Sequence, residues 1–180
     1  MSRFSYARQV VFSVLLLVQL VVPAQAKQET LANLKSAYIY NIAKFTSWPE
    51  SQSRSDMTSI NFCLYGSNEV IERLQGIEGK TIGKRLSRVI MPSEVSDFKR
   101  CHVLYIAPEE RKRYRYILSL IDEKQVITIS DDERFIKSGG LINLTEIEQR
   151  LRFQINVGLL ETQELHISSH LLKLAILVDE

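Results

Sequence analysis

The sequence predicts a single α/β domain, in which a mixed β-sheet is flanked by α-helices. Three observations support this fold class. Apolar runs of strand length alternate with amphipathic stretches between residues 60 and 129, two alternating runs within 141–157 resemble a β-hairpin, and a leucine-rich segment follows residue 168. Strands that alternate with helices typically form a mostly parallel sheet, whereas a hairpin adds antiparallel strands. We therefore expect a mixed sheet with a C-terminal hairpin and a covering helix.

Residues 1–26 are expected to form a signal peptide that is cleaved from the mature chain. Arg3 and Arg8 give a positively charged start, residues 10–22 form an apolar core, and Ala24-Gln25-Ala26 is a small-residue cleavage signature. The apolar core is shorter than the roughly 20 residues that a membrane span needs. A retained N-terminal anchor is the alternative. Residues 27–180 are expected to form one exported domain.

The charge of the chain gives little support for nucleic-acid binding. The formal net charge of the full sequence is +2. Arg3 and Arg8 account for this excess, because residues 1–26 contain no acidic side chain and no other basic one. The mature domain is therefore close to neutral, whereas a nucleic-acid site needs a concentrated basic face. We expect no nucleic-acid partner.

The two cysteines of the chain are interpreted through its export. Cys63 lies in the apolar run 60–65, and Cys101 begins another such run at 101–107. Neighbouring strands could hold the two side chains within bonding range. A disulfide is favoured in an oxidising compartment, and two buried free thiols are the alternative.

The first half of the mature chain is expected to alternate between helices and strands. Apolar residues at three- and four-residue steps predict an amphipathic helix from Glu29, ended by Trp48-Pro49. Its predicted buried stripe contains Leu31, Leu34, Tyr38, Ile42 and Phe45. The next segments are predicted to be an exposed loop (51–59), a strand (60–66), a short helix capped by Ser67 or Asn68 and running to Leu74, a loop (76–83), a weaker strand (85–91), a turn or short helix at Pro92-Ser93, and a strand buried on both faces (101–107).

The second half is expected to add one helix, one buried strand, the hairpin and the covering helix. Pro108 suits the first turn of a helix, whose buried stripe would contain Tyr114, Ile117, Leu118 and Ile121. A β-branched run at 126–129 predicts a buried strand. The glycine pair Gly139-Gly140 predicts a backbone segment that takes positive φ angles or packs closely against a neighbouring segment, because glycine has no Cβ atom. The hairpin is expected over 141–157, with its turn within 146–149. Ser168-Ser169 is expected to cap the last helix, which would carry Leu171, Leu172, Leu174, Ala175 and Val178.

Several motifs resemble catalytic, metal or nucleic-acid sites but lack the required context. Gly79-Lys80-Thr81 resembles the end of a phosphate-binding loop, but its glycine spacing is wrong. His166 and His170 have the spacing of helical zinc ligands, but the expected helix cap at Ser168-Ser169 lies between them, so they need not share one helix. His102 suits a packed strand residue better than a catalytic base. The mixture of cations and tyrosines at 111–116 is expected to form a solvated face, and a contact with anionic lipid or an acidic partner is the alternative. We expect no catalytic site, metal or cofactor.

Ser130-Asp131-Asp132 is the best candidate for a ligand site in the sequence. These residues follow a predicted buried strand, and open α/β sheets bind ligands beyond the carboxyl ends of their strands. Carboxylates at this position could bind a small molecule or a metal. Asx turns that cap the next segment explain the same residues equally well.

Three segments give the chain a resemblance to the YfiR-like family of periplasmic regulators. They are KSAYIYNIAKF at 35–45 with Trp48-Pro49, ITISD at 127–131 through GGLIN at 139–143, and RFQIN at 152–156 followed by ISSHLLKLA at 167–175. Together with Cys63 and Cys101, these segments span nearly the whole mature chain. None of them is a chemical motif, but their order and spacing as a set are specific.

The resemblance implies a non-enzymatic, often dimeric, periplasmic domain. Members of the repressor type are similar in binding the periplasmic region of an inner-membrane diguanylate cyclase, which they hold inactive until an outer-membrane lipoprotein sequesters them. Release raises cyclic di-GMP and favours biofilm. The resemblance also implies a disulfide between Cys63 and Cys101. Some members carry a second cysteine pair near the hairpin, and residues 140–153 contain no cysteine here.

Two further hypotheses compete with repression of a cyclase. On the repressor hypothesis, the chain binds its partner through exposed apolar groups near Trp48-Pro49 or on the last helix. On the second, a periplasmic sensor binds a small molecule at Ser130, Asp131 and the Gly139-Gly140 loop. On the third, a hydrolase depends on His102 or His170.

Overall fold

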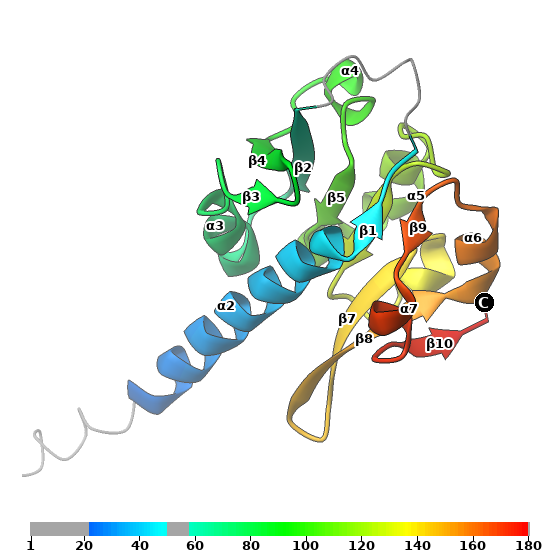
Figure 1. The fold of residues 1–180 in the computed structure, drawn as a ribbon. Helices are drawn as coiled ribbons and strands as arrows, with labels where there is room; N and C mark the ends of the chain where they lie inside the picture. The colour runs from blue at the N-terminus through cyan, green and yellow to red at the C-terminus, as the bar shows by residue number, and fades with distance from the viewer. Residues whose placement is uncertain (1–21, 50–57, 180) are drawn as a thin grey trace, which may run out of the picture.

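The computed structural model describes residues 22–49 and 58–179, with side chains from residue 28 onward. Most of the expected signal peptide and of the expected loop 51–59 lies outside these residues. The described residues form an eight-stranded sheet with helices on both faces, which confirms the predicted fold class (Figure 1). The strand order is β10-β8-β7-β6-β5-β2-β4-β3.

The centre of the sheet is parallel and its outer strands run the other way. The parallel strands are β2 (Ser59–Tyr65), β4 (Arg85–Ile90), β5 (Val103–Ile106), β6 (Ile127–Ser130) and β7 (Ile142–Ile147). The strands β8 (Arg150–Asn156) and β3 (Thr81–Ile82) are antiparallel to β7 and β4, and β10 (Ile176–Val178) is parallel to β8. The predicted hairpin is therefore confirmed as β7–β8. Its turn is confined to Glu148 and Gln149, whose φ values of 50° and 60° suit a two-residue hairpin loop.

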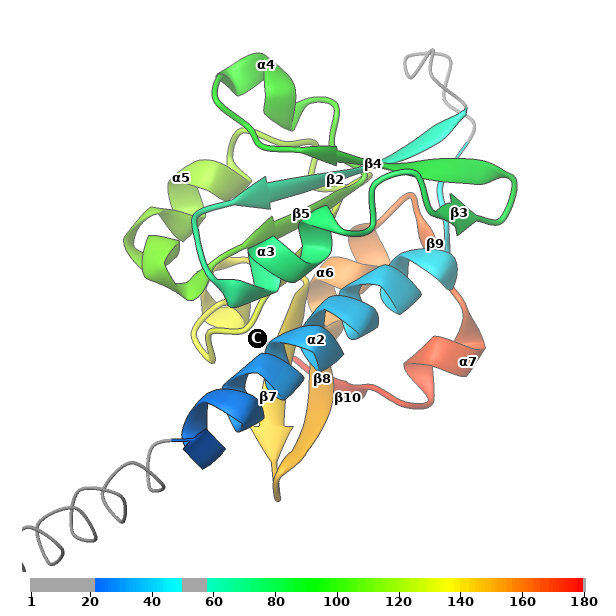
Figure 2. The ribbon, with the colours of Figure 1, turned by 90° about the vertical axis from the view of Figure 1, so that its left-hand side faces the viewer.

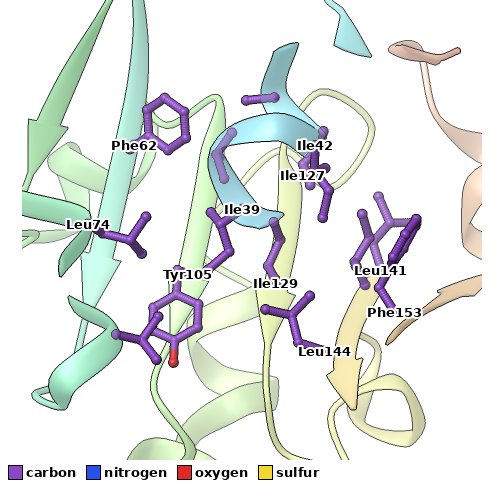
Figure 3. Close-up of a cluster of buried hydrophobic side chains, with 14 of the residues drawn as sticks. Ile39, Ile42, Phe62, Leu74, Tyr105, Ile127, Ile129, Leu141, Leu144 and Phe153 are labelled. Atoms are coloured by element: carbon purple, nitrogen blue, oxygen red, sulfur yellow. The ribbon is translucent and has the colours of Figure 1, made fainter. Parts of the chain in front are cut away.

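Two helices cover one face of the sheet. The long helix α2 (Val22–Lys44) crosses this face, and α3 (Glu69–Gln75) packs beside it (Figure 2). Asn68 caps α3, as predicted, by accepting a hydrogen bond from the Ile71 backbone N–H. Figure 3 shows Ile39 and Ile42 of α2 among the side chains of the core strands, and both are at most 1% exposed. Each fully buried apolar side chain of this size stabilises the fold by about 1.5–3 kcal/mol.

A second apolar cluster covers the opposite face. Its helical side chains come from α4 (Val95–Phe98) and from α5 (Tyr114–Leu118), which follows the 3₁₀ helix η1 (Pro108–Arg113). Tyr114, Ile117 and Leu118 are buried, and Ile121 packs against them, as the predicted stripe requires. The Cys63–Cys101 disulfide lies in this cluster, with its Cα atoms 5.6 Å apart. The predicted disulfide is confirmed.

The helix α2 differs from its prediction at both ends. Its described backbone is already helical at Val22, before the expected Glu29, and passes through the expected cleavage point after Ala26. It ends at Lys44 instead of Trp48 because the next residues pair with a distant strand. Thr46 and Ser47 form β1 (Thr46–Ser47), which is antiparallel to β9 (His166–Ile167). Thr46 also donates a side-chain hydrogen bond to the Ile42 carbonyl.

Two predicted loops contain strand residues. Ser59, assigned to an exposed loop, is buried in β2, where it is paired with Leu86 of β4. Thr81 and Ile82, within the predicted loop 76–83, form the edge strand β3. Both differences arise from pairing with β4, the weaker of the predicted strands.

The C-terminal segment forms a single helical turn and then a strand. Ser168 caps α7 (Ser169–Leu172) as predicted, but Ile176–Val178 is strand β10 instead of the rest of a helix. The open edge of β8 supplies a pairing partner for the β-branched residues Ile176 and Val178. A short helix not predicted from the sequence, α6 (Val157–Thr162), follows β8 and is capped by Asn156.

Candidate functional site

Asp131 lies in a polar network at the carboxyl ends of β5 and β6. The Lys35 Nζ atom is 2.5 Å from Asp131 Oδ2, and the Tyr105 hydroxyl donates a hydrogen bond of 2.6 Å to Oδ1. The Asn68 side-chain amide donates in turn to the Tyr105 hydroxyl at 3.0 Å. The network therefore ties α2 and the cap of α3 to two central strands.

Burial keeps the phenol of this network protonated. Desolvation and the neighbouring Asp131 carboxylate raise the pKa of Tyr105 well above its ordinary value, so Tyr105 acts as a hydrogen-bond donor. Both carboxylate oxygens of Asp131 already have a donor from the chain itself. This arrangement favours a structural role for Asp131 over the binding of an external ligand or metal.

The residues beside Asp131 are also engaged within the chain. Ser130 is fully buried, and its hydroxyl donates to the Ile106 carbonyl at 2.7 Å and lies 2.9 Å from the Tyr114 hydroxyl. Burial raises the pKa of Tyr114 to about 12. Asp132 accepts a hydrogen bond from the Arg134 backbone N–H, which is the Asx turn that the sequence also allowed.

The glycine pair is not part of the Asp131 site. Gly139 has a φ of +96°, and a Cβ atom on Gly140 would lie 2.2 Å from the Phe135 ring, so both predicted reasons for glycine are present. Ile142 is paired with Ile129 in parallel register. Gly140 is therefore about 13 Å from Asp131 along the strands, at roughly 3.3 Å per residue. The structure does not bring together the two halves of the expected small-molecule site.

A hollow remains beside Asp131. It has a volume of about 390 Å³, and polar side chains of the β6–β7 region and of Lys35 line much of it. Asn143, Thr145 and Arg134 lie on its lining. This volume is at the low end of the range for small-molecule sites.

Trp48 is buried, contrary to its expected role as an exposed apolar group. Its indole packs edge-on against the His102 ring, with centroids 5.7 Å apart. Pro49 beside it is exposed. His102 is itself buried and accepts a hydrogen bond from the Asn61 backbone N–H at Nδ1, which confirms it as a packed side chain, although it lies just before β5 instead of inside the strand.

His166 and His170 lie on different elements, β9 and α7, as the capping residue between them indicated. Among the residues that the structure describes, no group of three histidine, cysteine or carboxylate side chains is placed to hold a metal ion. Within the same residues, no helix has both the length and the apolar character needed to cross a membrane.

An apolar groove lies between α2, β8 and α7. We call it the α2–α7 groove, and its volume is about 360 Å³. Its lining residues are Tyr38, Asn41, Ile42, Lys44 and Phe45 on one side, Arg152 and Phe153 of β8, and Leu171 and Leu174 on the other side. The Tyr38 and Phe153 rings meet edge-on with centroids 6.2 Å apart, and the Tyr38 hydroxyl donates to the Leu151 carbonyl.

The sequence located this groove only in part. The expected surface on the last helix contains Leu171 and Leu174, and both line the groove. Leu34 and Phe45 were assigned to the buried stripe of the first helix, but they are 42% and 44% exposed. Ala32, Ile39 and Ala43 are buried instead, so the core-facing side of α2 is rotated from the predicted one. The helical pattern that grouped Tyr38, Ile42 and Phe45 was the available signal for the groove, because all three line it.

The model of a family described as YfiR/HmsC-like matches residues 32–176, which is about four fifths of the chain. Comparison with curated proteins gives no match.

Proposed function

The chain belongs to the YfiR/HmsC-like family, and from this membership we propose that it is a non-enzymatic periplasmic regulator of an inner-membrane diguanylate cyclase. In this proposal it binds the periplasmic region of the cyclase and holds the enzyme inactive. Cyclic di-GMP and biofilm formation are then kept low. The family match over residues 32–176 is the observation that carries the proposal.

The arrangement of the polar side chains supports action by binding. Ser130, Asp131 and His102 each make hydrogen bonds within the chain, and all three are buried or nearly so. A general base or nucleophile needs to reach a substrate. An apolar groove bordered by cations, by contrast, is a surface that another protein can occupy.

A disulfide and the expected signal peptide support a periplasmic location. Cys63 and Cys101 are fully buried and bonded, and disulfides persist in oxidising compartments. We further propose that an outer-membrane lipoprotein relieves repression by sequestering the chain, and that the chain can form a homodimer.

Repression requires a difference in affinity between two states of the cyclase. A ligand shifts an equilibrium only by its differential affinity for the two conformations. To change an active fraction from 99% to 1%, the regulator must bind the inactive form about 10⁴-fold more tightly. The chain therefore needs a surface that fits only the inactive arrangement of the partner.

The test is intracellular cyclic di-GMP after deletion of the gene. Complementation uses the full chain and a version that lacks residues 2–26, with cell fractionation to confirm where each one accumulates. We expect deletion to raise cyclic di-GMP and only the exported version to restore it. Unchanged cyclic di-GMP after deletion, or restoration by the version retained in the cytoplasm, would contradict the proposal.

The hollow beside Asp131 supports a second candidate function, a periplasmic small-molecule sensor. A ligand that binds only the folded chain would stabilise it by about 2.7 kcal/mol at 100 times its dissociation constant. Thermal unfolding of the purified protein against a metabolite panel tests this candidate. An Asn143→Leu variant, which changes the lining of the hollow, should lose any stabilisation that arises there.

A further inference from the structure

We propose that the α2–α7 groove is the docking surface for an acidic amphipathic segment of the partner protein. This inference rests on the proposed function, because it names the surface and the kind of segment through which the regulator would bind. The segment would place apolar side chains against Tyr38, Phe45 and Leu174 and would carry carboxylates beside them.

The apolar part of the groove is presented to solvent. Phe45 is 44% exposed and Leu174 is 61% exposed, although both border a core in which Ile42 is 1% exposed. Leu34, one helical turn before Tyr38, extends the exposed apolar stripe of α2 and is 42% exposed. From Leu34 to Phe45 the stripe covers about 16 Å at 1.5 Å per residue. That length accommodates roughly three turns of a bound helix, with apolar anchors at helical spacing.

The charges at the groove have one sign. Lys44 and Arg152 are its two charged lining residues, and both are exposed. Among the residues that the structure describes, neither has an acidic partner within ion-pair distance. The Lys44 ammonium group lies over the Tyr40 ring at 5.8 Å, a contact that does not neutralise its charge. An apolar surface bordered by two cations that have no acidic partner among the described residues complements a segment that is apolar and acidic.

The groove also lies on an open stretch of sheet edge. On its outer edge, β8 pairs with β10 only at residues 154–156. Among the described strands, residues 150–153 pair only with β7, on the inner edge of β8. Arg152 and Phe153 in this stretch are held in register by their pairing with β7, and Tyr38 and Ile42 are held by α2. A preformed surface of this kind costs little ordering when a partner binds.

The first experiment uses photo-crosslinking in cells that contain the cyclase. Benzoylphenylalanine replaces Leu174 at the groove in one variant. In the matched control it replaces Leu86, which is 53% exposed on β4, near the opposite edge of the sheet. We expect a crosslink from position 174 to an acidic amphipathic segment of the cyclase's periplasmic region, identified by mass spectrometry, and none from position 86. A crosslink from position 86 alone, or from 174 to lipid, to a second copy of this chain or to a basic segment, would overturn the inference.

The second experiment reverses the groove charges. The Lys44→Glu/Arg152→Glu variant is compared with Lys84→Glu/Lys112→Glu, which makes the same change in net charge at exposed positions outside the groove. We expect the groove variant to bind the cyclase's periplasmic region at least about tenfold more weakly, with a smaller salt dependence, and the control to change affinity less than about twofold. Equal effects of the two variants would overturn the inference. Circular dichroism and thermal unfolding confirm that both variants are folded.

The two proposals can fail separately. If deletion raises cyclic di-GMP but the groove variant represses and binds like the control, the regulator function stands and the groove assignment is wrong. If deletion leaves cyclic di-GMP unchanged while position 174 crosslinks to an acidic segment of another membrane protein, the groove stands and the cyclase is the wrong partner.

Discussion

Removal of the Asp131 carboxylate is expected to loosen the attachment of α2 to the sheet. Asp131 has a side-chain exposure of 8% and Lys35 of 18%, so their ion pair is largely withdrawn from water. In Asp131→Asn, Lys35 keeps its charge but loses its counter-charge. Tyr105 still has an amide oxygen to which its hydroxyl can donate.

The size of the effect follows from this partial burial. Breaking a fully buried pair by removing one partner costs about 3–5 kcal/mol, whereas an exposed pair contributes about 0–1 kcal/mol. Because Lys35 can recover part of its hydration, we expect Asp131→Asn to lower the free energy of unfolding by about 2–3 kcal/mol. Lys35→Met should cost a similar amount, since it leaves the Asp131 charge unpaired. The double variant should cost less than the sum of the two, with a coupling of about 1–2 kcal/mol.

Urea unfolding of the four proteins of this double-mutant cycle measures the coupling. Glu29→Gln is the matched control, because the Glu29–Arg73 pair also attaches α2 but its side chains are 61% and 39% exposed. We expect this control to change stability by less than about 1 kcal/mol. Strictly additive effects of Asp131→Asn and Lys35→Met, or a loss below about 0.5 kcal/mol for either of them, would refute the argument from burial.

Three further predictions concern the disulfide, a glycine and alkaline pH. Replacing both Cys63 and Cys101 with alanine opens a loop with a sequence separation of 38 residues. Urea unfolding should show that the free energy of unfolding falls by about 4 kcal/mol, as the chain-entropy model predicts. A fall of less than about 1 kcal/mol would contradict this prediction. Gly140→Ala should destabilise the protein in thermal unfolding, because the new Cβ would lie 2.2 Å from the Phe135 ring, whereas Gly158→Ala, whose nearest contact is 3.5 Å, should have a small effect. The fold raises the pKa of Tyr114 from 10.0 to about 12, so as the pH rises this phenol loses its proton in the unfolded protein before it does so in the folded protein. Its contribution to the free energy of unfolding is therefore complete below pH 10 and is lost as the pH rises toward 12. Tyr114→Phe should make the stability less dependent on pH between 10 and 12, as measured by urea unfolding at each pH, and an unchanged dependence would contradict the assignment.

The fold was largely predictable because its central strands are strongly patterned. The continuous apolar runs at 60–65, 101–107 and 126–129 have the character of strands buried on both faces, and all three lie in the parallel centre of the sheet. The Asn68 and Ser168 caps were also visible, since each needs only local hydrogen bonds.

The differences arise where distant pairing decides the local structure. Thr46 and Ser47 leave the helical pattern because they pair with β9. Ile176–Val178 becomes a strand because β8 has a free edge, which no local pattern reveals. Trp48 precedes a proline and a polar stretch, so exposure was predicted, but the fold places it in the main hydrophobic core and against the His102 ring.

The candidate site was harder to predict than the fold. Asp131 was identified from its place at a strand end, but its partners Lys35 and Tyr105 come from other elements. The α2–α7 groove combines residues from three separate segments, none of which has an unusual composition. Only the register of the folded chain brings them together.

The pairing of Thr46 with Ile167 also constrains the order of folding. Contacts between residues so far apart in sequence close large loops and slow the folding of a domain. The groove needs Phe45 on one side of this contact and Leu171 on the other, so it cannot form on a nascent or partly folded chain. A partner that recognises the groove would thereby distinguish finished molecules from incomplete ones, and docking would itself serve as a check that folding is complete.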